Sequence, residues 1–176
     1  MKHFIIITNR PKDPDLEITR RVQELLKLRQ ASCSVYADEI PKEEWKRILL
    51  REGDRTDAIL VLGGDGTMLR AARDTADSQI PMLGINLGTL GYLTEVEKNG
   101  MEDAIDRLVA GSYQVEDRMM LCGQIYRQGR MEEENSALND ITITRCGHLR
   151  MLYFQIYVNG KLLKEYHADG IIIATP

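Results

Sequence analysis

The stretch Ala58-Ile59-Leu60-Val61-Leu62-Gly63-Gly64-Asp65-Gly66-Thr67 decides how the first half of this chain is interpreted. Its apolar residues form a short continuous run, which predicts a strand covered on both faces in a parallel sheet. Glycines then turn the chain, and Met68, Leu69 and Ala72 follow at helical spacing. The segment therefore predicts a strand, a glycine loop and a helix in immediate succession.

The same alternation of strand and helix extends to both sides of this segment. Short apolar runs predict further strands at residues 4–8, 32–36 and 81–85, and amphipathic spacing predicts helices at residues 14–29, 41–50 and 101–110. Strands that alternate with helices form right-handed units with parallel strands. We therefore expect an α/β fold with an N-terminal, Rossmann-like, doubly wound parallel sheet.

After Gly111 the pattern changes to strands separated by polar turns. Candidate strands lie at residues 113–126, 138–144, 151–158, 161–166 and 171–174, and Asn159-Gly160 predicts a hairpin turn. Two domains are expected: an α/β nucleotide-binding domain at residues 1–111 and a partial, antiparallel β-sandwich at residues 112–176. Because its last apolar strand is followed only by Thr175-Pro176, the second domain is expected to be incomplete.

Composition narrows the class of function. The chain has 23 Lys and Arg against 27 Asp and Glu, a net charge of −4, so nucleic acid is not an expected partner. Its apolar run at residues 4–7 is too short for a signal peptide or a membrane span, which predicts a cytoplasmic protein without a membrane partner. Three separated cysteines predict neither disulfides nor a metal site, and His3, His148 and His167 lack ligand spacing. The run Glu132-Glu133-Glu134 is expected in a solvated hairpin loop.

The loop Gly63-Gly64-Asp65-Gly66-Thr67 has a chemistry of its own. Glycines let backbone N–H groups approach an anion, and the N-terminus of the following helix adds partial positive charge, so phosphate is the expected ligand. The loop matches neither GxGxxG nor the Walker sequence. The carboxylate of Asp65 could contact an attacking hydroxyl or bind magnesium. Alternatively, Asp65 could cap a helix that begins near Thr67.

Five motifs occur in the order typical of one family. They are GGDGT at residues 63–67, GINLGTLGYLTE at 84–95, DRMML at 117–121, ALNDI at 137–141 and ADGIIIATP at 168–176. The chain resembles the NAD kinases. This resemblance implies transfer of the γ-phosphate of ATP to the 2′-hydroxyl of the adenosine ribose of NAD, giving NADP, with Mg²⁺ or another divalent cation accompanying ATP.

The resemblance also implies roles for individual residues. Asp65 is the expected catalytic residue, which hydrogen-bonds the ribose hydroxyls and acts as, or replaces, a general base. ATP phosphates are expected at Gly63, Gly64, Gly66 and Thr67. NAD is expected to contact Asp65, Gly66, Asn86, Tyr92, Asn139, Asp140, Asp169 and Thr175, with Asp140 as the acid of an Asn-Asp pair and Tyr92 where Phe is common. No residue is expected to ligate a resident metal ion.

Two alternatives to an active NAD kinase stay open at this point. Family members continue past the equivalent of Thr175-Pro176 into further strands, so this chain is expected to be shortened at its C-terminal end and could be an inactive nucleotide-binding fragment. A lipid kinase of the diacylglycerol type shares GGDGT but lacks the later motifs in this order. We also expect a homo-oligomer.

Overall fold

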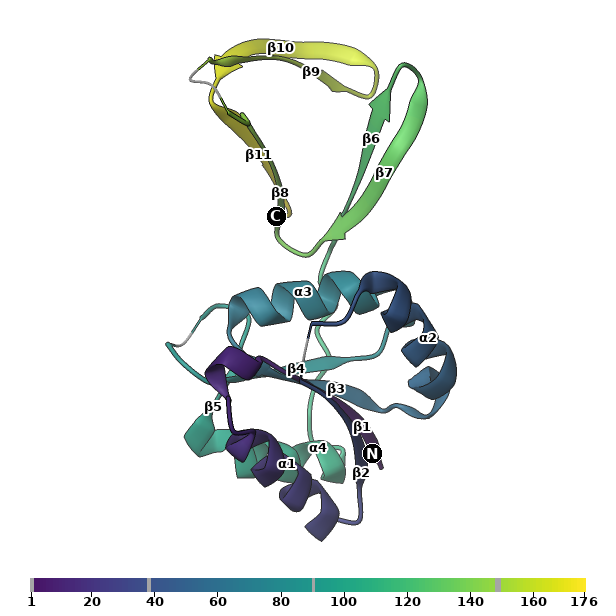
Figure 1. Ribbon diagram of the computed structural model, residues 1–176, viewed down its shortest axis with the longest axis vertical. Helices are drawn as coiled ribbons and strands as arrows, with labels where there is room; N and C mark the ends of the chain where they lie inside the picture. Colours follow the sequence, from purple (N-terminus) through teal and green to yellow (C-terminus); the bar gives the residue numbers. More distant parts are fainter. Residues whose placement is uncertain (1, 38, 90, 148–149) are drawn as a thin grey trace. The chain divides into compact units, whose positions relative to one another are not determined.

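The computed structural model describes residues 2–37, 39–89, 91–147 and 150–176, so Leu90 of the second glycine loop and His148 lie outside the described residues (Figure 1). The chain divides into two compact units, residues 1–117 and 118–176. The boundary expected near Gly111 coincides with the end of the last helix, and the extended residues 112–117 group with the first unit.

The first unit is built on a parallel sheet with the strand order β2-β1-β3-β4-β5. Its strands are β1 (His3–Thr8), β2 (Ser32–Tyr36), β3 (Ala58–Gly63), β4 (Met82–Asn86) and β5 (Val96–Glu97). The expected parallel sheet is confirmed, and the short edge strand β5 is an addition that the sequence pattern did not predict. From β1 the chain first moves outward to β2 and then returns to place β3 on the other side of β1.

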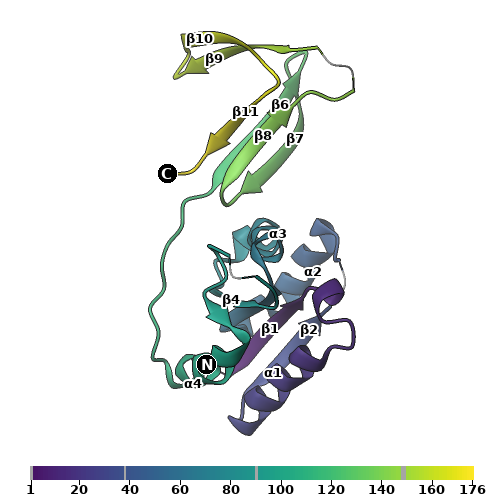
Figure 2. The same cartoon turned by 90° about the vertical axis from the view of Figure 1, so that its left-hand side faces the viewer.

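Helices cover both faces of this sheet (Figures 1 and 2). They are α1 (Glu17–Leu28), α2 (Lys42–Glu52), α3 (Asp65–Thr75) and α4 (Met101–Ala110), with short 3₁₀ helices η1 (Arg10–Lys12), η2 (Gly53–Arg55), η3 (Ala76–Ser78) and η4 (Lys98–Gly100). Side chains alternate along β1, so Phe4 and Ile6 pack with α1 and α4 while Ile5 and Ile7 pack with α2 and α3. This alternation buries β1 on both faces.

Helix α1 begins at Glu17, three residues later than the Pro14 start expected from the sequence. The reason is the buried carboxylate of Asp13, which accepts hydrogen bonds from the N–H groups of Ile18 (3.2 Å) and Thr19 (2.9 Å). Asp13 therefore serves as a side-chain cap for the first turn, and the residues before it form the 3₁₀ helix η1.

The second unit consists of antiparallel strands. They are β6 (Leu121–Arg127), β7 (Arg130–Ala137), β8 (Asp140–Thr144), β9 (Leu152–Val158), β10 (Lys161–Ala168) and β11 (Gly170–Ala174). The expected antiparallel β structure is confirmed in the form of three two-stranded ladders, β6 with β7, β8 with β11 and β9 with β10.

Two tight turns connect hairpins in this unit. Asn159 and Gly160 both have positive φ (50° and 76°), which confirms the predicted turn between β9 and β10. Gln128 and Gly129 also have positive φ (49° and 76°) and join β6 to β7. The second turn was not predicted, because glutamine is not a residue typical of that position.

Two expectations for this half are wrong. Residues 132–134 lie within β7 and not in a hairpin loop, since the turn lies earlier and the three glutamates occupy an exposed strand. The strand expected at residues 113–126 begins only at Leu121, which pairs with Ala137. Strand β7 ends at Ala137, so residues 112–120 have no partner in that ladder, and the backbone needs such a partner to form a strand.

No helix in the described ranges is both long and apolar enough to cross a membrane.

The cap at Asp13 yields a stability prediction. Replacing Asp13 with Ala leaves the N–H of Thr19 buried without an acceptor, so we expect the free energy of unfolding to fall by about 2 kcal/mol. Urea unfolding, followed by the fluorescence of Trp45, the single tryptophan, measures this change in the first unit. Asp15→Ala, at an exposed neighbouring position, is the matched control and should change stability little.

The pH dependence of this contribution has a definite sign. Burial acts to raise the pKa of Asp13, but the hydrogen bonds from Thr19 and Ile18 outweigh it and place the pKa below its ordinary value of 3.8. The stabilisation is therefore complete above that ordinary value and is lost as the pH falls through the folded-state pKa. Equal stability of Asp13→Ala and wild type at neutral pH would contradict the assignment.

Candidate nucleotide site

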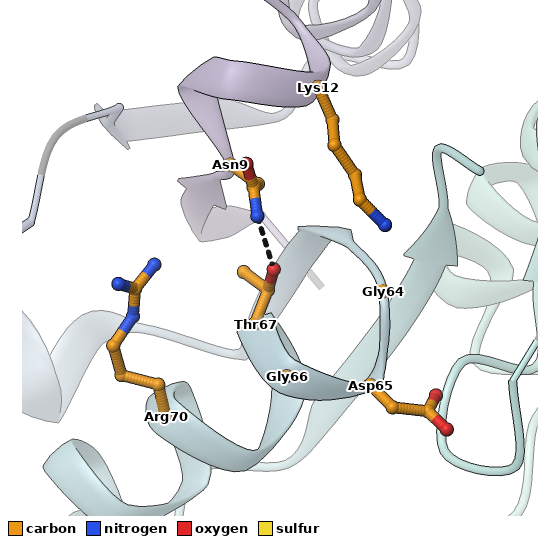
Figure 3. A pocket seen from close by; sticks show the side chains of 7 residues that line it. All are labelled: Asn9, Lys12, Gly64, Asp65, Gly66, Thr67 and Arg70. Carbon is orange, nitrogen blue, oxygen red and sulfur yellow. Dashed lines mark hydrogen bonds between the residues drawn. The ribbon is translucent and has the colours of Figure 1, made fainter.

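A pocket of about 250 Å³ opens where β1 and β3 end (Figure 3). Because the chain leaves neighbouring strands β1 and β3 in opposite directions, this edge is the topological switch point at which ligands bind in doubly wound sheets. The residues that line the pocket are Asn9, Lys12, Gly64, Asp65, Gly66, Thr67 and Arg70. The structure thus places most of the predicted phosphate loop on a cavity, together with three residues that the sequence analysis missed.

The N-terminus of α3 forms one wall of the pocket. The helix begins at Asp65, with Gly64 as its extended N-cap residue, and the first N–H groups of any helix lack partners within the helix. A Cβ at Gly63 would overlap the side chain of Thr67, so glycine is needed there to admit the threonine. Thr67 is buried, and its Oγ1 accepts a hydrogen bond from Nδ2 of Asn9 at 2.9 Å.

Lys12 brings a positive charge to the glycine loops from another part of the chain. Its Nζ lies 2.7 Å from the position that a Cβ would take at Gly64, and 3.3 Å from the equivalent position at Gly88. The ammonium of Lys12 forms no hydrogen bond or ion pair with the part of the chain that the structure describes. Only the rule that carboxyl ends of neighbouring parallel strands meet could have found this residue, because it follows β1 and not the GGDGT motif.

Arg70 supplies a second cationic side chain, from the first turns of α3 (Figure 3). Its guanidinium forms an ion pair with the exposed carboxylate of Glu39. Such an exposed pair contributes little to stability and leaves the guanidinium available to a stronger anion. Lys12 and Arg70 together make the pocket cationic, although no basic residue stands inside the glycine motif itself.

The carboxylate of Asp65 is directed away from Lys12 and toward the second glycine loop (Figure 3). Its Oδ2 accepts the N–H of Tyr92 at 2.8 Å, and its Oδ1 accepts the N–H of Leu93 at 3.1 Å. The hydrogen bond from Tyr92 is the largest influence that lowers the pKa of Asp65 below its ordinary value. The alternative in which Asp65 caps α3 is wrong, since the N-cap is Gly64 and α3 begins before Thr67.

Asn86 stabilises the second glycine loop from inside. Its buried side chain donates to the carbonyl oxygen of Thr89 (2.7 Å) and accepts from the N–H of Gly88 (2.7 Å). Tyr92, in contrast, has a side chain that is 97% exposed, and only its backbone contacts Asp65. The structure therefore brings Tyr92 to Asp65 and leaves its ring free for a ligand.

The remaining predicted residues lie at the two ends of the ladder of β8 and β11 in the second unit. Thr175 donates from its backbone N (2.8 Å) and its Oγ1 (3.1 Å) to the carbonyl oxygen of Asn139, and Asp140 begins β8 beside them. Asp169 lies at the opposite end of this ladder, where its carboxylate forms an ion pair with Arg145 at 3.2 Å. Asn139, Asp140 and Thr175 thus form one group, and Asp169 stands apart from it.

Across the described ranges, no group of three or more His, Cys, Asp or Glu side chains is arranged to hold a metal ion. The carboxylate of Asp65 is engaged by backbone N–H groups. The described residues around Asp65 therefore do not form a protein cage for a divalent cation.

Comparison with known proteins agrees with this arrangement. Residues 4–113 match the family model of the ATP-NAD kinase N-terminal domain. An NAD kinase of Agathobacter rectalis is 44% identical over 177 residues, which cover 100% of this chain and 62% of that protein. An NAD kinase of Lachnospira eligens is 39% identical over 184 residues, covering 99% of this chain and 61% of that protein.

The fold is also found among solved structures. Yeast NADH kinase, determined in complex with NADH, matches with a TM-score of 0.72 and 19% sequence identity, over 98% of this chain and 57% of that chain. The chain thus spans about three fifths of the length of the relatives that it matches. Its glycine loops, its switch-point pocket and the match over residues 4–113 together show that the chain belongs to the NAD kinase family.

Proposed function

We propose that the chain works as an ATP-dependent NAD kinase, which transfers the γ-phosphate of ATP to the 2′-hydroxyl of the adenosine ribose of NAD and so forms NADP. The observation that carries this proposal is the ammonium of Lys12, which lies beside the N-terminus of α3 and has no side-chain partner among the residues that the structure describes. An unpaired cation next to a helix N-terminus is suited to a polyphosphate. Membership of the family supplies the identity of the nucleotides.

The triphosphate of ATP is proposed to bind in the pocket between Gly64 and Arg70. Backbone N–H groups at the start of α3 would donate to its oxygens, and Lys12 and Arg70 would neutralise its charge. Thr67 is proposed to donate a hydrogen bond to a phosphate oxygen. Its Oγ1 accepts a hydrogen bond from Asn9, which leaves the hydroxyl hydrogen to be donated. Gly63 supports this geometry by leaving room for Thr67.

The acceptor hydroxyl is proposed to lie against Asp65. In the reaction, the ribose oxygen forms a bond to the γ-phosphorus while the bond from that phosphorus to the bridging oxygen of ADP breaks, and the hydroxyl proton passes to solvent. Asp65 accepts a hydrogen bond from the hydroxyl and so orients it. Gly66, Asn86 and Tyr92 in the first unit are proposed to contact the acceptor nucleotide.

In the second unit, the residues proposed to contact NAD are Asn139, Asp140, Asp169 and Thr175. The side chain of Asn139 forms no hydrogen bond within the described ranges, while its carbonyl oxygen is held by Thr175. Its amide is therefore available to a ligand without any rearrangement of the backbone. Asp140 is exposed and lies directly beside it.

Magnesium is proposed to arrive as a complex with ATP. Mg²⁺ keeps several waters and binds substrate phosphates more readily than cages made only of protein groups. This accords with the lack of a three-residue ligand group in the described ranges, and we assign no residue of this chain as its ligand.

A homo-oligomer that acts in the cytoplasm stays part of the proposal. The acidic composition and the exposed apolar side chains of the second unit, such as Ile172 and Leu163, accord with it. Sedimentation of the purified chain tests the assembly, and a monomer at every concentration would contradict it.

The phosphate pocket yields the first prediction about function. Lys12→Ala should weaken ATP binding about tenfold, equivalent to about 1.4 kcal/mol, because a charge-assisted contact to the triphosphate is lost. Isothermal titration calorimetry of the chain with Mg·ATP measures this. Lys46→Ala removes the same charge from an exposed position on α2 and serves as the control. Similar affinities of the two variants would remove Lys12 from the site.

Turnover tests the activity itself. The purified chain is given Mg·ATP and NAD, and an NADP-specific dehydrogenase measures any NADP formed; NADP formation would support the kinase proposal for this chain. Asp65→Asn should abolish NADP formation and leave ATP binding nearly unchanged, because backbone and cations hold the phosphates while Asp65 serves the acceptor. ATP binding without any turnover in the unmodified chain would favour the alternative of a nucleotide-binding protein that is not itself a kinase.

A further prediction separates the two substrates. Asn139→Ala removes a side-chain amide that has no hydrogen-bond partner among the described residues, and it leaves the carbonyl contact with Thr175 intact. The change should therefore weaken NAD binding by about 1–3 kcal/mol and leave ATP binding unchanged. Fluorescence or calorimetric titration with each nucleotide provides the measurement. Asn135→Ala, on the exposed strand β7, is the control. Equal weakening of ATP and NAD would refute the assignment.

A further inference from the structure

Gly91 lies directly against the carboxylate of Asp65. A Cβ added at Gly91 would overlap Cγ, Oδ1 and Oδ2 of Asp65, and all three nearest atoms belong to that one side chain. The φ angle of Gly91 is not in the left-handed region, so this angle does not call for glycine. The need for glycine at this position therefore comes from the aspartate and not from the backbone.

Residues 91–94, here called the clamp loop, surround the same carboxylate with donors. Besides the N–H groups of Tyr92 and Leu93, the hydroxyl of Thr94 donates to Oδ1 at a longer distance of 3.4 Å. An ionised carboxylate offers about four acceptor positions. Oδ1 receives two of these three hydrogen bonds and Oδ2 receives one, and the backbone N–H of Thr94 also acts on the carboxylate. Oδ2 is therefore the oxygen with more room for a further donor.

The clamp loop is itself held against the sheet. Thr94 is 1% exposed, and its Cα and Cγ2 both lie 3.0 Å from the position that a Cβ would take at Gly84 of β4. Glycine at position 84 thus lets Thr94 approach the strand closely. The donors that surround Asp65 are therefore fixed to the parallel sheet by a buried residue.

We infer that the clamp loop is a positioning element for Asp65, in which Gly91 and Thr94 fix the carboxylate so that Oδ2 receives the hydroxyl that attacks phosphorus. This inference rests on the proposed function for the identity of that hydroxyl. The contacts with Gly91, Tyr92, Leu93 and Thr94 do not depend on it.

The electrostatics of the clamp agree with this role. Hydrogen bonds to the ionised form, the one from Tyr92 first, lower the pKa of Asp65 below its ordinary value. A carboxylate with a lowered pKa stays ionised and is a weak proton acceptor. Asp65 is thus arranged to orient a hydroxyl, while the proton departs to solvent.

The test follows the titration of the Asp65 carboxyl carbon by NMR in the nucleotide-free chain. In the wild type the titration midpoint should lie below the ordinary value of 3.8. Gly91→Ala displaces the carboxylate from its donors, so the midpoint should rise toward that value, and the amide protons of Tyr92 and Leu93 should exchange faster. Gly53→Ala, at a helix end where an added Cβ meets only Leu49 Cβ at 4.0 Å, should change neither observable. An unchanged Asp65 midpoint in Gly91→Ala would overturn the inference.

A double variant keeps the test decisive if Gly91→Ala is too unstable to titrate. In an Asp65→Ala background the carboxylate that the new Cβ would strike is gone, so Gly91→Ala should no longer lower the thermal unfolding midpoint. Rescue of folding by Asp65→Ala therefore supports the clamp. The same loss of stability in both backgrounds would show that Gly91 is required for another reason, and would refute it.

These measurements are separable from the proposed function. They use no nucleotide. A chain that forms no NADP would therefore contradict the kinase proposal, while the titration and the rescue would still support the role of the clamp loop. Conversely, normal NADP formation by Gly91→Ala would disprove the positioning role while leaving the kinase assignment intact. In an active chain, Gly91→Ala should reduce turnover at least tenfold and change ATP affinity less than twofold, because the phosphate pocket does not include Gly91.

Discussion

The parallel pairing of β1 with β3 is the constraint on which the site depends. Phe4 to Thr8 align with Ala58 to Leu62, and the N–H of Asn9 extends the pairing to the carbonyl oxygen of Leu62 at 2.8 Å. The chain leaves these neighbouring strands toward opposite sides, so their carboxyl ends open a pocket that neither segment could form alone. Burial of β1 on both faces keeps the two ends in register.

Charge separation explains how a carboxylate can stand at an anion site. Lys12 and Arg70 lie on the pocket, while the carboxylate of Asp65 is directed to backbone donors of the clamp loop (Figure 3). Backbone N–H groups stabilise the ionised acid without adding a competing side-chain cation beside it. Asp65, at the start of α3, can therefore contact the acceptor hydroxyl while the N–H groups of the same helix N-terminus bind the phosphates.

The two glycine motifs lie side by side in the structure, although they occupy residues 63–67 and 84–95 of the sequence. Gly64 and Gly88 both leave room for the ammonium of Lys12, and Gly91 leaves room for Asp65. Each glycine is thus matched to a particular charged side chain from elsewhere in the chain. At these positions glycine permits close approach of a side chain, since none of the three has a φ in the left-handed region.

The sequence alone determined the parallel sheet, the helices on both faces and the phosphate loop, because buried strands and amphipathic helices follow local periodicity. It also determined the Asn159-Gly160 turn, whose positive φ angles suit those residue types.

Only the tertiary structure showed Lys12 and Asn9 at the loop, since their position depends on which strand lies beside β3. Likewise, the contact of Gly91 with Asp65 joins segments that no periodicity relates, and the placement of residues 132–134 in β7 depended on a turn at Gln128-Gly129. Local patterns specify elements, whereas the partners of a charged side chain are decided by packing between elements distant in the chain.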